Sequence, residues 1–188
     1  MSVPDKAFID HVKRSIARPG PNAPKGVQVS IFAQAARLSF TQAINDAVTA
    51  PTGFDPAAAA LFEGAVESAY LVATCDGALD PTEDAVLRAV ISAGGPVSDK
   101  QVDGLLLGLA RAVALDGASE RLSRLSYMVS KPAHQHEILR VAALVAHASG
   151  GVRPAERAIF DKIAQGFSLP ASAVDAAVAE AESALASR

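Results

Sequence analysis

The stretch AYLVATCDGALDPTEDA at residues 69–85 returns without a gap as AALVAHASGGVRPAERA at residues 142–158. Eight of 23 aligned positions counted from residue 69 are identical in the copy, so the likeness extends beyond the turn itself. Each copy reads as an apolar helix, a tight glycine turn, and Pro-x-Glu at the start of another helix. Duplication of one such supersecondary unit bounds the fold, and it predicts two repeated helix–turn–helix units, at about residues 58–93 and 133–166.

The composition favours an all-α protein. Half of the 188 residues are apolar, but aromatic residues make up only 5% and Trp is absent. The core must then be built from Ala, Leu, Val and Ile, and Ala is the best helix former. No segment shows the period-two alternation of a strand. We therefore predict a helical bundle of about seven helices plus an N-terminal helical arm.

Capping signals place several helix starts. Asp55-Pro56 and Asp80-Pro81 each combine an N-cap residue with proline at the first helical position. Glu83 completes a capping box with Asp80, and Gly77 suits a left-handed turn. A further helix is expected from about Gln28 to about Val48.

The first 26 residues differ from the rest of the chain. Residues 1–40 carry six Lys or Arg and two Asp or Glu, net +4, whereas the remainder carries net −7. Three prolines and two glycines between Arg18 and Gly26 break the helical pattern. The sequence thus predicts a basic arm or linker at 1–26, separable from a helical domain at 27–188. The apolar face of the arm helix would bury against the body, a partner or a second copy.

Net charge and cysteine content limit the class of partner and the cellular compartment that we expect. A formal charge of −3 excludes a strongly basic nucleic-acid binder as the default. A single Cys fits a reducing compartment, no secretory signal is seen, and no uncharged apolar run approaches the roughly 18 residues of a membrane span. We expect a cytoplasmic protein without a transmembrane segment, whose partner is another protein or a further copy of itself.

The repeated motif resembles the TerB-like helical domain (tellurite-resistance TerB/DjlA-type). The resemblance rests on ATCDGALDPTE at residues 73–83, AHASGGVRPAE at 146–156, and the tail IAQGFSLP at 163–170, and it covers about residues 58–186. It implies an all-α bundle with internal pseudo-twofold symmetry. It also implies a link to stress and metal-oxyanion resistance, and divalent-metal binding by acidic residues near the two turns.

Four acidic residues are the candidate metal ligands: Asp76, Asp80, Glu83 and Asp116. Their carboxylates are the hard oxygen ligands that Ca²⁺ and Mg²⁺ prefer. The alternative is structural, because Asp80 and Glu83 already serve the capping box. The second copy has Ser149 and Arg153 where the first has Asp76 and Asp80, so a symmetric acidic site is not available. Any tight ion is expected in the first repeat.

The other reactive side chains favour structural roles. His134 and His136 lie two apart, and on a helix such neighbours point about 200° from each other, so they do not readily share one ion. His147 is interpreted as a helix-end residue. Cys75 adjoins a carboxylate at a helix C-terminus, where thiolate is disfavoured. We find no phosphate-binding loop and no nucleophile elbow.

Two functions follow. The first is a non-enzymatic TerB-like module that acts through protein contacts in a stress or resistance setting and is tuned by a divalent cation. The second is a small metal- or ligand-binding protein with a cavity between the two repeats. Convergence of Asp76 and Glu83 on an ion or pocket would favour the second function.

Overall fold

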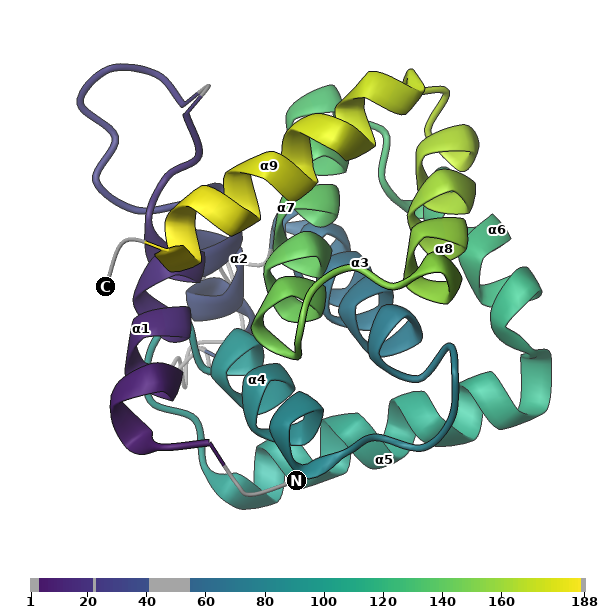
Figure 1. Ribbon diagram of the computed structural model, residues 1–188, viewed down its shortest axis with the longest axis horizontal. Coiled ribbons are helices and arrows are strands. Elements are labelled where there is room, and N and C mark those ends of the chain that lie inside the picture. The colour runs from purple at the N-terminus through teal and green to yellow at the C-terminus, as the bar shows by residue number, and fades with distance from the viewer. Residues whose placement is uncertain (1–3, 22, 41–54, 187–188) are drawn as a thin grey trace, which may run out of the picture.

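The computed structural model describes residues 4–21, 23–40 and 55–186, and all regular structure in these ranges is helical. Its helices, shown in Figure 1, are α1 (Lys6–Ala17), α2 (Ile31–Phe40), α3 (Pro56–Ala73), α4 (Pro81–Ile91), α5 (Asp99–Asp116), α6 (Ala118–Met128), α7 (Pro132–Ala148), α8 (Pro154–Gly166) and α9 (Ala171–Ala186). None of these helices combines enough length with enough apolar character to cross a membrane. The all-α prediction is confirmed.

Helices α3 and α7 form the centre of the bundle. From Gly64 to Ala73 every residue of α3 is buried, and so is every residue of α7 from Glu137 to Ala146. A helix that is apolar on nearly all sides is stable only when other helices surround it. The two helices pack against each other, α2 and α4 also contact both, and α9 lies along α7 (Figure 1).

The predicted capping signals are confirmed. The carboxylate of Asp55 accepts hydrogen bonds from the backbone N–H groups of Ala57 and Ala58 at the start of α3. Asp80 and Glu83 form the full capping box of α4. These caps hold because each depends on residues within three positions of the helix start.

The two repeated segments share their local features. Each has a buried first helix, a turn that contains glycine, and a second helix with proline at its first position. Gly77 has φ +157° and Gly150 has φ +125°, in line with the predicted turn. Superposition of the two units stays a prediction.

The predicted count of about seven helices plus the arm is too low. Nine helices occur in the described ranges, and the additional one arises at Gly117. Its backbone, with φ +81° and ψ 150°, ends α5 and starts α6 as a separate helix. Helix α2 begins at Ile31 rather than near Gln28, and the expected continuation over residues 41–48 lies outside the described residues.

The N-terminal helix packs inside the same core as the rest. Val12 and Ile16 are fully buried in the common hydrophobic cluster, and α1 contacts α4 and α7. The Arg140 guanidinium of α7 donates to the carbonyl oxygens of Ser15, at 3.3 Å, and Ile16, at 2.9 Å. The apolar face of α1 is thus buried against the body, and the boundary predicted after residue 26 is not visible as a gap in the packing.

Candidate functional site

The four predicted metal ligands do not gather at one point. Asp76, Asp80 and Glu83 lie at the turn between α3 and α4, whereas Asp116 lies at the end of α5. The Asp80 carboxylate accepts, through Oδ1, the backbone N–H groups of Thr82, at 2.7 Å, and Glu83, at 2.8 Å. Only Asp76 and Glu83 therefore face a common charged partner.

That partner is the guanidinium of Arg153. It donates to carboxylate oxygens of Asp76, of Glu83 at 3.1 Å and of Glu156 at 2.9 Å. Arg153 occupies in the second repeat the position that Asp80 has in the first. One side chain thus ties the two turns together across 70 residues of sequence or more.

The glutamates of this cluster are deeply buried. Glu156 is fully buried and Glu83 is 4% exposed. Each also accepts the backbone N–H of the residue that precedes its helix, Arg153 at 2.7 Å and Asp80 at 2.9 Å. Burial raises the pKa of Glu83, and the hydrogen bond to Glu156 raises the pKa of Arg153, which keeps the guanidinium charged. The arginine supplies the positive charge that these carboxylates require.

No set of three or more His, Cys, Asp or Glu side chains within the described ranges is arranged to hold a metal ion. Around the turns the positive charge is instead that of Arg153, half-exposed and in contact with three carboxylates. Binding of Ca²⁺ or Mg²⁺ by Asp76, Asp80, Glu83 or Asp116 remains a prediction from the sequence.

Replacing Arg153 by Met should lower the free energy of unfolding by about 2 kcal/mol. Breaking a buried ion pair costs about 3–5 kcal/mol because a charge is left uncompensated. Here solvent reduces that cost, since the arginine side chain is 46% exposed. The measurement is urea denaturation followed by circular dichroism. Arg157→Met is the matched control, because the ion-pair partners of Arg157 among the described residues, Asp161 and Asp175, are both exposed. Equal losses in the two variants would contradict the proposed role of the cluster.

Asp116 belongs to a second charged network. Its carboxylate pairs with Arg121, at 3.3 Å, and Arg124, at 2.9 Å, and Arg121 also binds the buried Glu67 of α3. The network fastens α6 and the end of α5 to the central helix. Sequence reasoning missed Glu67 because its partner is 54 residues away, and nothing local marks a buried glutamate within an apolar helix.

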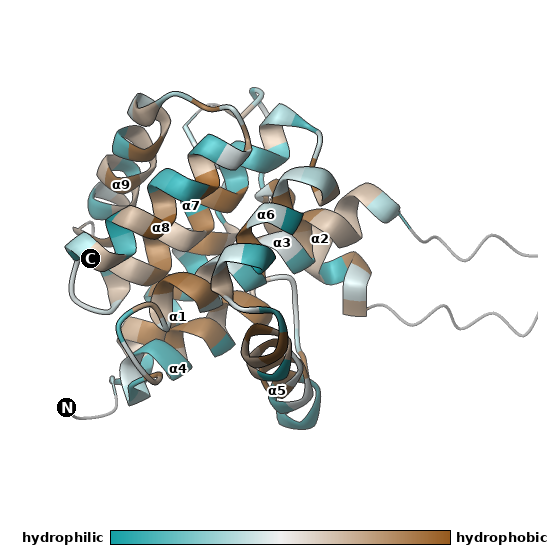
Figure 2. Ribbon diagram, turned by 90° about the vertical axis from the view of Figure 1, so that its right-hand side faces the viewer, coloured by the Kyte–Doolittle hydropathy of each residue, from teal (hydrophilic) through white to brown (hydrophobic). Residues whose placement is uncertain are grey.

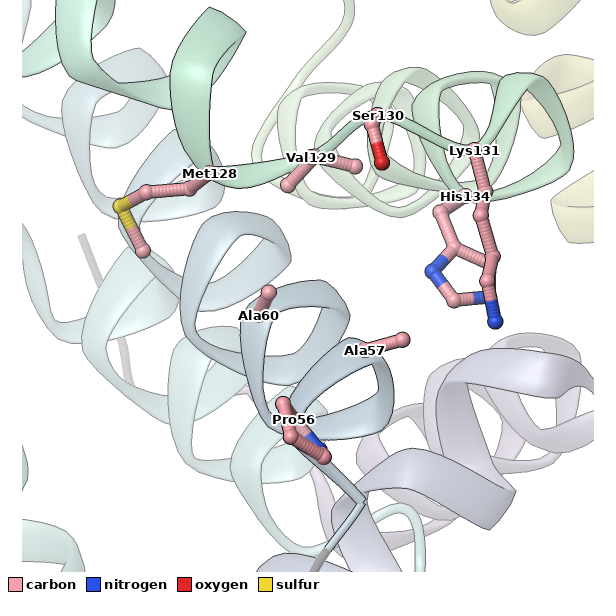
Figure 3. Close-up of a pocket in the computed structure, with 8 residues that line it drawn as sticks. All are labelled: Pro56, Ala57, Ala60, Met128, Val129, Ser130, Lys131 and His134. Atoms are coloured by element: carbon pink, nitrogen blue, oxygen red, sulfur yellow. The ribbon is translucent and has the colours of Figure 1, made fainter.

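The two neighbouring histidines face different parts of the molecule. His134 lines a small pocket of about 200 Å³ between the start of α3 and the α6–α7 connection, together with Met128, Val129 and Lys131 (Figure 3). His136 is exposed and lines a different, larger cavity. The expectation that they point apart is confirmed. Burial, followed by the charge of Lys131, lowers the pKa of His134.

The lowered pKa of His134 predicts a loss of stability in mild acid. Between the folded-state pKa and the unfolded value of about 6.5, the unfolded chain binds more protons than the folded one. Stability therefore rises with pH through this window and is lost as pH falls below about 6.5. We expect His134→Gln to reduce the drop in melting temperature between pH 7.5 and 5.5, and exposed His136→Gln to leave it unchanged. The same drop in the His134 variant as in the wild type would contradict this assignment.

Cys75 is half-buried beside the charged cluster. Burial raises the pKa of its thiol, and the carboxylates of Glu156 and Asp76 raise it further. A thiol in such surroundings is a poor nucleophile at neutral pH, which agrees with the interpretation from the sequence.

Large apolar side chains are exposed mainly on α5 and α6. Four of the six exposed large hydrophobic residues in the described ranges lie on these two helices: Leu107, Leu115, Tyr127 and Met128. Only Val102 and Leu106 of α5 are buried. Figure 2 shows α5 at the edge of the bundle, beyond α4 and away from α7 and α9. We call the exposed residues Gly104, Leu107, Gly108, Arg111 and Leu115 the α5 face.

The larger cavity does not lie between the two repeats. It has a volume of about 570 Å³ and is bounded by the segment from Pro19 to Gln34, the start of α7, and α9, with no residue of α3 or α4 in its wall. Its location differs from that of the predicted inter-repeat cavity.

Comparisons with models of known protein families, with curated proteins and with solved structures found no match for this chain.

Proposed function

We propose that this protein is a non-enzymatic, TerB-like helical module that acts by binding another protein chain through the α5 face. The setting that the resemblance implies is a stress or metal-oxyanion resistance pathway. Support for the family comes from the two glycine turns, each followed by Pro-x-Glu, and from the buried helices α3 and α7 that precede them.

The exposure of α5 carries this proposal. Leu107 is 52% exposed and Leu115 is 85% exposed, on a helix of 18 residues that buries only two of its side chains. Full burial of one leucine is worth about 1.5–3 kcal/mol. Covering the exposed parts of both residues would contribute about 2–4 kcal/mol toward the roughly 8 kcal/mol of micromolar binding.

The shape of the α5 face also suits a protein partner. A Cβ added to Gly104 or Gly108 would meet no atom within 4 Å, so the backbone there is open to close approach. Arg111, in the same stripe, forms no ion pair in the described ranges and offers a charged donor at the rim. Apolar anchors with an arginine beside them are typical of protein interfaces.

The proposal is tested by site-specific photo-crosslinking in the cell of origin. A photoreactive residue at Leu115 should give discrete adducts, and the same residue at exposed Gln165 on α8 should not. Leu107→Asp combined with a crosslinker at Leu115 should abolish the adducts while the circular dichroism spectrum stays unchanged. Adducts of equal yield at both positions, or adducts that persist with Leu107→Asp, would contradict the α5 face as the binding surface.

The alternative function is that of a small metal- or ligand-binding protein, and binding of a divalent cation can be tested separately. A divalent ion at Asp76 or Glu83 would have to displace the guanidinium of Arg153, which already binds both. We expect the same melting temperature in chelator, Ca²⁺ and Mg²⁺. A rise in melting temperature in Ca²⁺ that Asp76→Asn abolishes would instead favour the metal-binding alternative.

A further inference from the structure

The cavity of about 570 Å³ lies between a proline-rich loop, α7 and α9. The loop, at the upper left of Figure 1, lies beside α9. The volume of the cavity falls within the range of small-molecule sites, about 300–1,000 Å³. The cavity is separate from the α5 face, because none of its lining residues belongs to α5 or α6.

The floor of the cavity is a buried ion pair. Arg140 donates from Nε to one oxygen of Glu137 and from Nη2 to the other, both at 2.8 Å. Two further N–H groups of the arginine reach the carbonyl oxygens of Ser15 and Ile16, and Glu137 also accepts from the backbone N–H of Phe32 at 3.3 Å. The four bonds of the arginine leave one of the five guanidinium N–H groups, and it belongs to Nη1, the nitrogen nearest Glu180. A bound anion at that N–H would therefore lie beside the Glu180 carboxylate.

Glu180 is the carboxylate of the cavity that lacks such partners. Its carboxylate accepts no hydrogen bond from the described residues. The nearest cation, Nη1 of Arg140, is 3.9 Å away, which is beyond hydrogen-bond distance. The side chain is only 25% exposed, and burial raises the pKa of its carboxyl. Arg140 is the one guanidinium beside two carboxylates, Glu137 and Glu180, so this group carries one net negative charge when both carboxylates are ionised.

The walls of the cavity are aliphatic. Three prolines of the loop and three alanines of α9 line it together with Val27 and Ile31, and no Phe, Tyr or Trp is among the lining residues. A quaternary ammonium ion is usually held by an aromatic cage, which this lining does not provide. A cation bound here must therefore donate N–H groups to the carboxylate.

We propose that this cavity binds a small organic ammonium ion that carries at least one N–H. The ammonium group donates to the carboxylate of Glu180, and the apolar body lies against the loop prolines and the α9 alanines. Binding supplies the hydrogen bonds that Glu180 lacks and covers the apolar wall of the cavity. The ammonium group and the apolar body of the ligand therefore both contribute to affinity.

The test uses the full chain and four matched probes in amide-resolved NMR titrations. The probes are 2-phenylethylamine, its N,N,N-trimethyl derivative, 2-phenylethanol and phenylacetate. We expect the primary amine to bind with shift changes at Gly20, Ala177 and Glu180, and the other three to bind at least tenfold more weakly, since a hydrogen bond to a charged group is worth about 1.5–3 kcal/mol. No saturable binding of the amine, or equal binding of the alcohol or the trimethylated probe, would overturn the proposal.

Variants of α9 separate the cavity from adventitious binding. Glu180→Gln should weaken the amine about tenfold or more, and exposed Glu182→Gln should not. Ala176→Phe, on the cavity wall, should block the amine by filling the space, whereas Ala179→Phe, outside the lining, should leave affinity unchanged. Unchanged affinity in both the Glu180 and the Ala176 variants would place the amine elsewhere and overturn the assignment.

Discussion

Deletion of residues 1–26 should abolish cooperative unfolding. Val12 and Ile16 are fully buried, and each contributes about 1.5–3 kcal/mol through burial of its side chain. The deletion also removes the carbonyl oxygens that bind the buried Arg140, and each buried donor left unsatisfied costs about 1–3 kcal/mol. The sum rivals the entire stability of a typical domain, about 5–15 kcal/mol.

Thermal melting followed by circular dichroism measures this effect. A chain that begins at Pro4 is the control, because it retains Asp5, the N-cap of α1, and should melt like the full protein. Separability of the arm, expected from the sequence alone, predicts the opposite result. A cooperative transition of the 27–188 fragment near the wild-type temperature would support the arm and contradict the packing argument.

Replacement of Gly94 by Ala should lower the melting temperature by about 10 °C. An added Cβ would lie 2.4 Å from the backbone nitrogen of Arg37 and 2.6 Å from the carbonyl oxygen of Ala33. Backbone atoms of a packed helix cannot move aside as a flexible side chain can. The turn after α4 must therefore shift away from α2, at a cost of about 3 kcal/mol.

Gly108→Ala is the matched control for this prediction. Gly108 lies within α5 and a Cβ there would meet no atom within 4 Å, so alanine should stabilise the helix by about 1 kcal/mol. The two glycine-to-alanine changes thus have opposite expected signs. A fall in the Gly108 variant equal to that in the Gly94 variant would show that close approach to α2 is not the cause.

Much of the secondary structure could be predicted from the sequence because its signals are local. Asp55, Asp80 and Ser98 cap the helices that follow them, and each cap is made within three residues. The largely apolar sequences of α3 and α7 indicate central helices, since apolar residues on nearly every side of a helix reflect burial. The division of α5 from α6 was less clear, because one glycine is compatible with either a kink or a break.

The candidate metal site shows the limit of this reasoning. The sequence identified the acidic residues near the first turn, but it did not show that the positive charge beside them is the guanidinium of Arg153. Arg153 belongs to the other repeat, and only the packing of the two units brings its guanidinium to Asp76 and Glu83. Asp116, grouped with them by its chemistry, lies with Arg121 and Arg124 instead.

The sequence by itself determined the helical class, the helix starts and the likeness of the two turns, because propensity, capping and periodicity act over a few residues. Only the tertiary structure decided that α1 lies in the core, that one arginine compensates the carboxylates of both turns, and that Glu180 lines a cavity without accepting a hydrogen bond from the described residues. These features depend on contacts between residues about 40 to 170 positions apart, and such contacts leave no periodic mark on the chain.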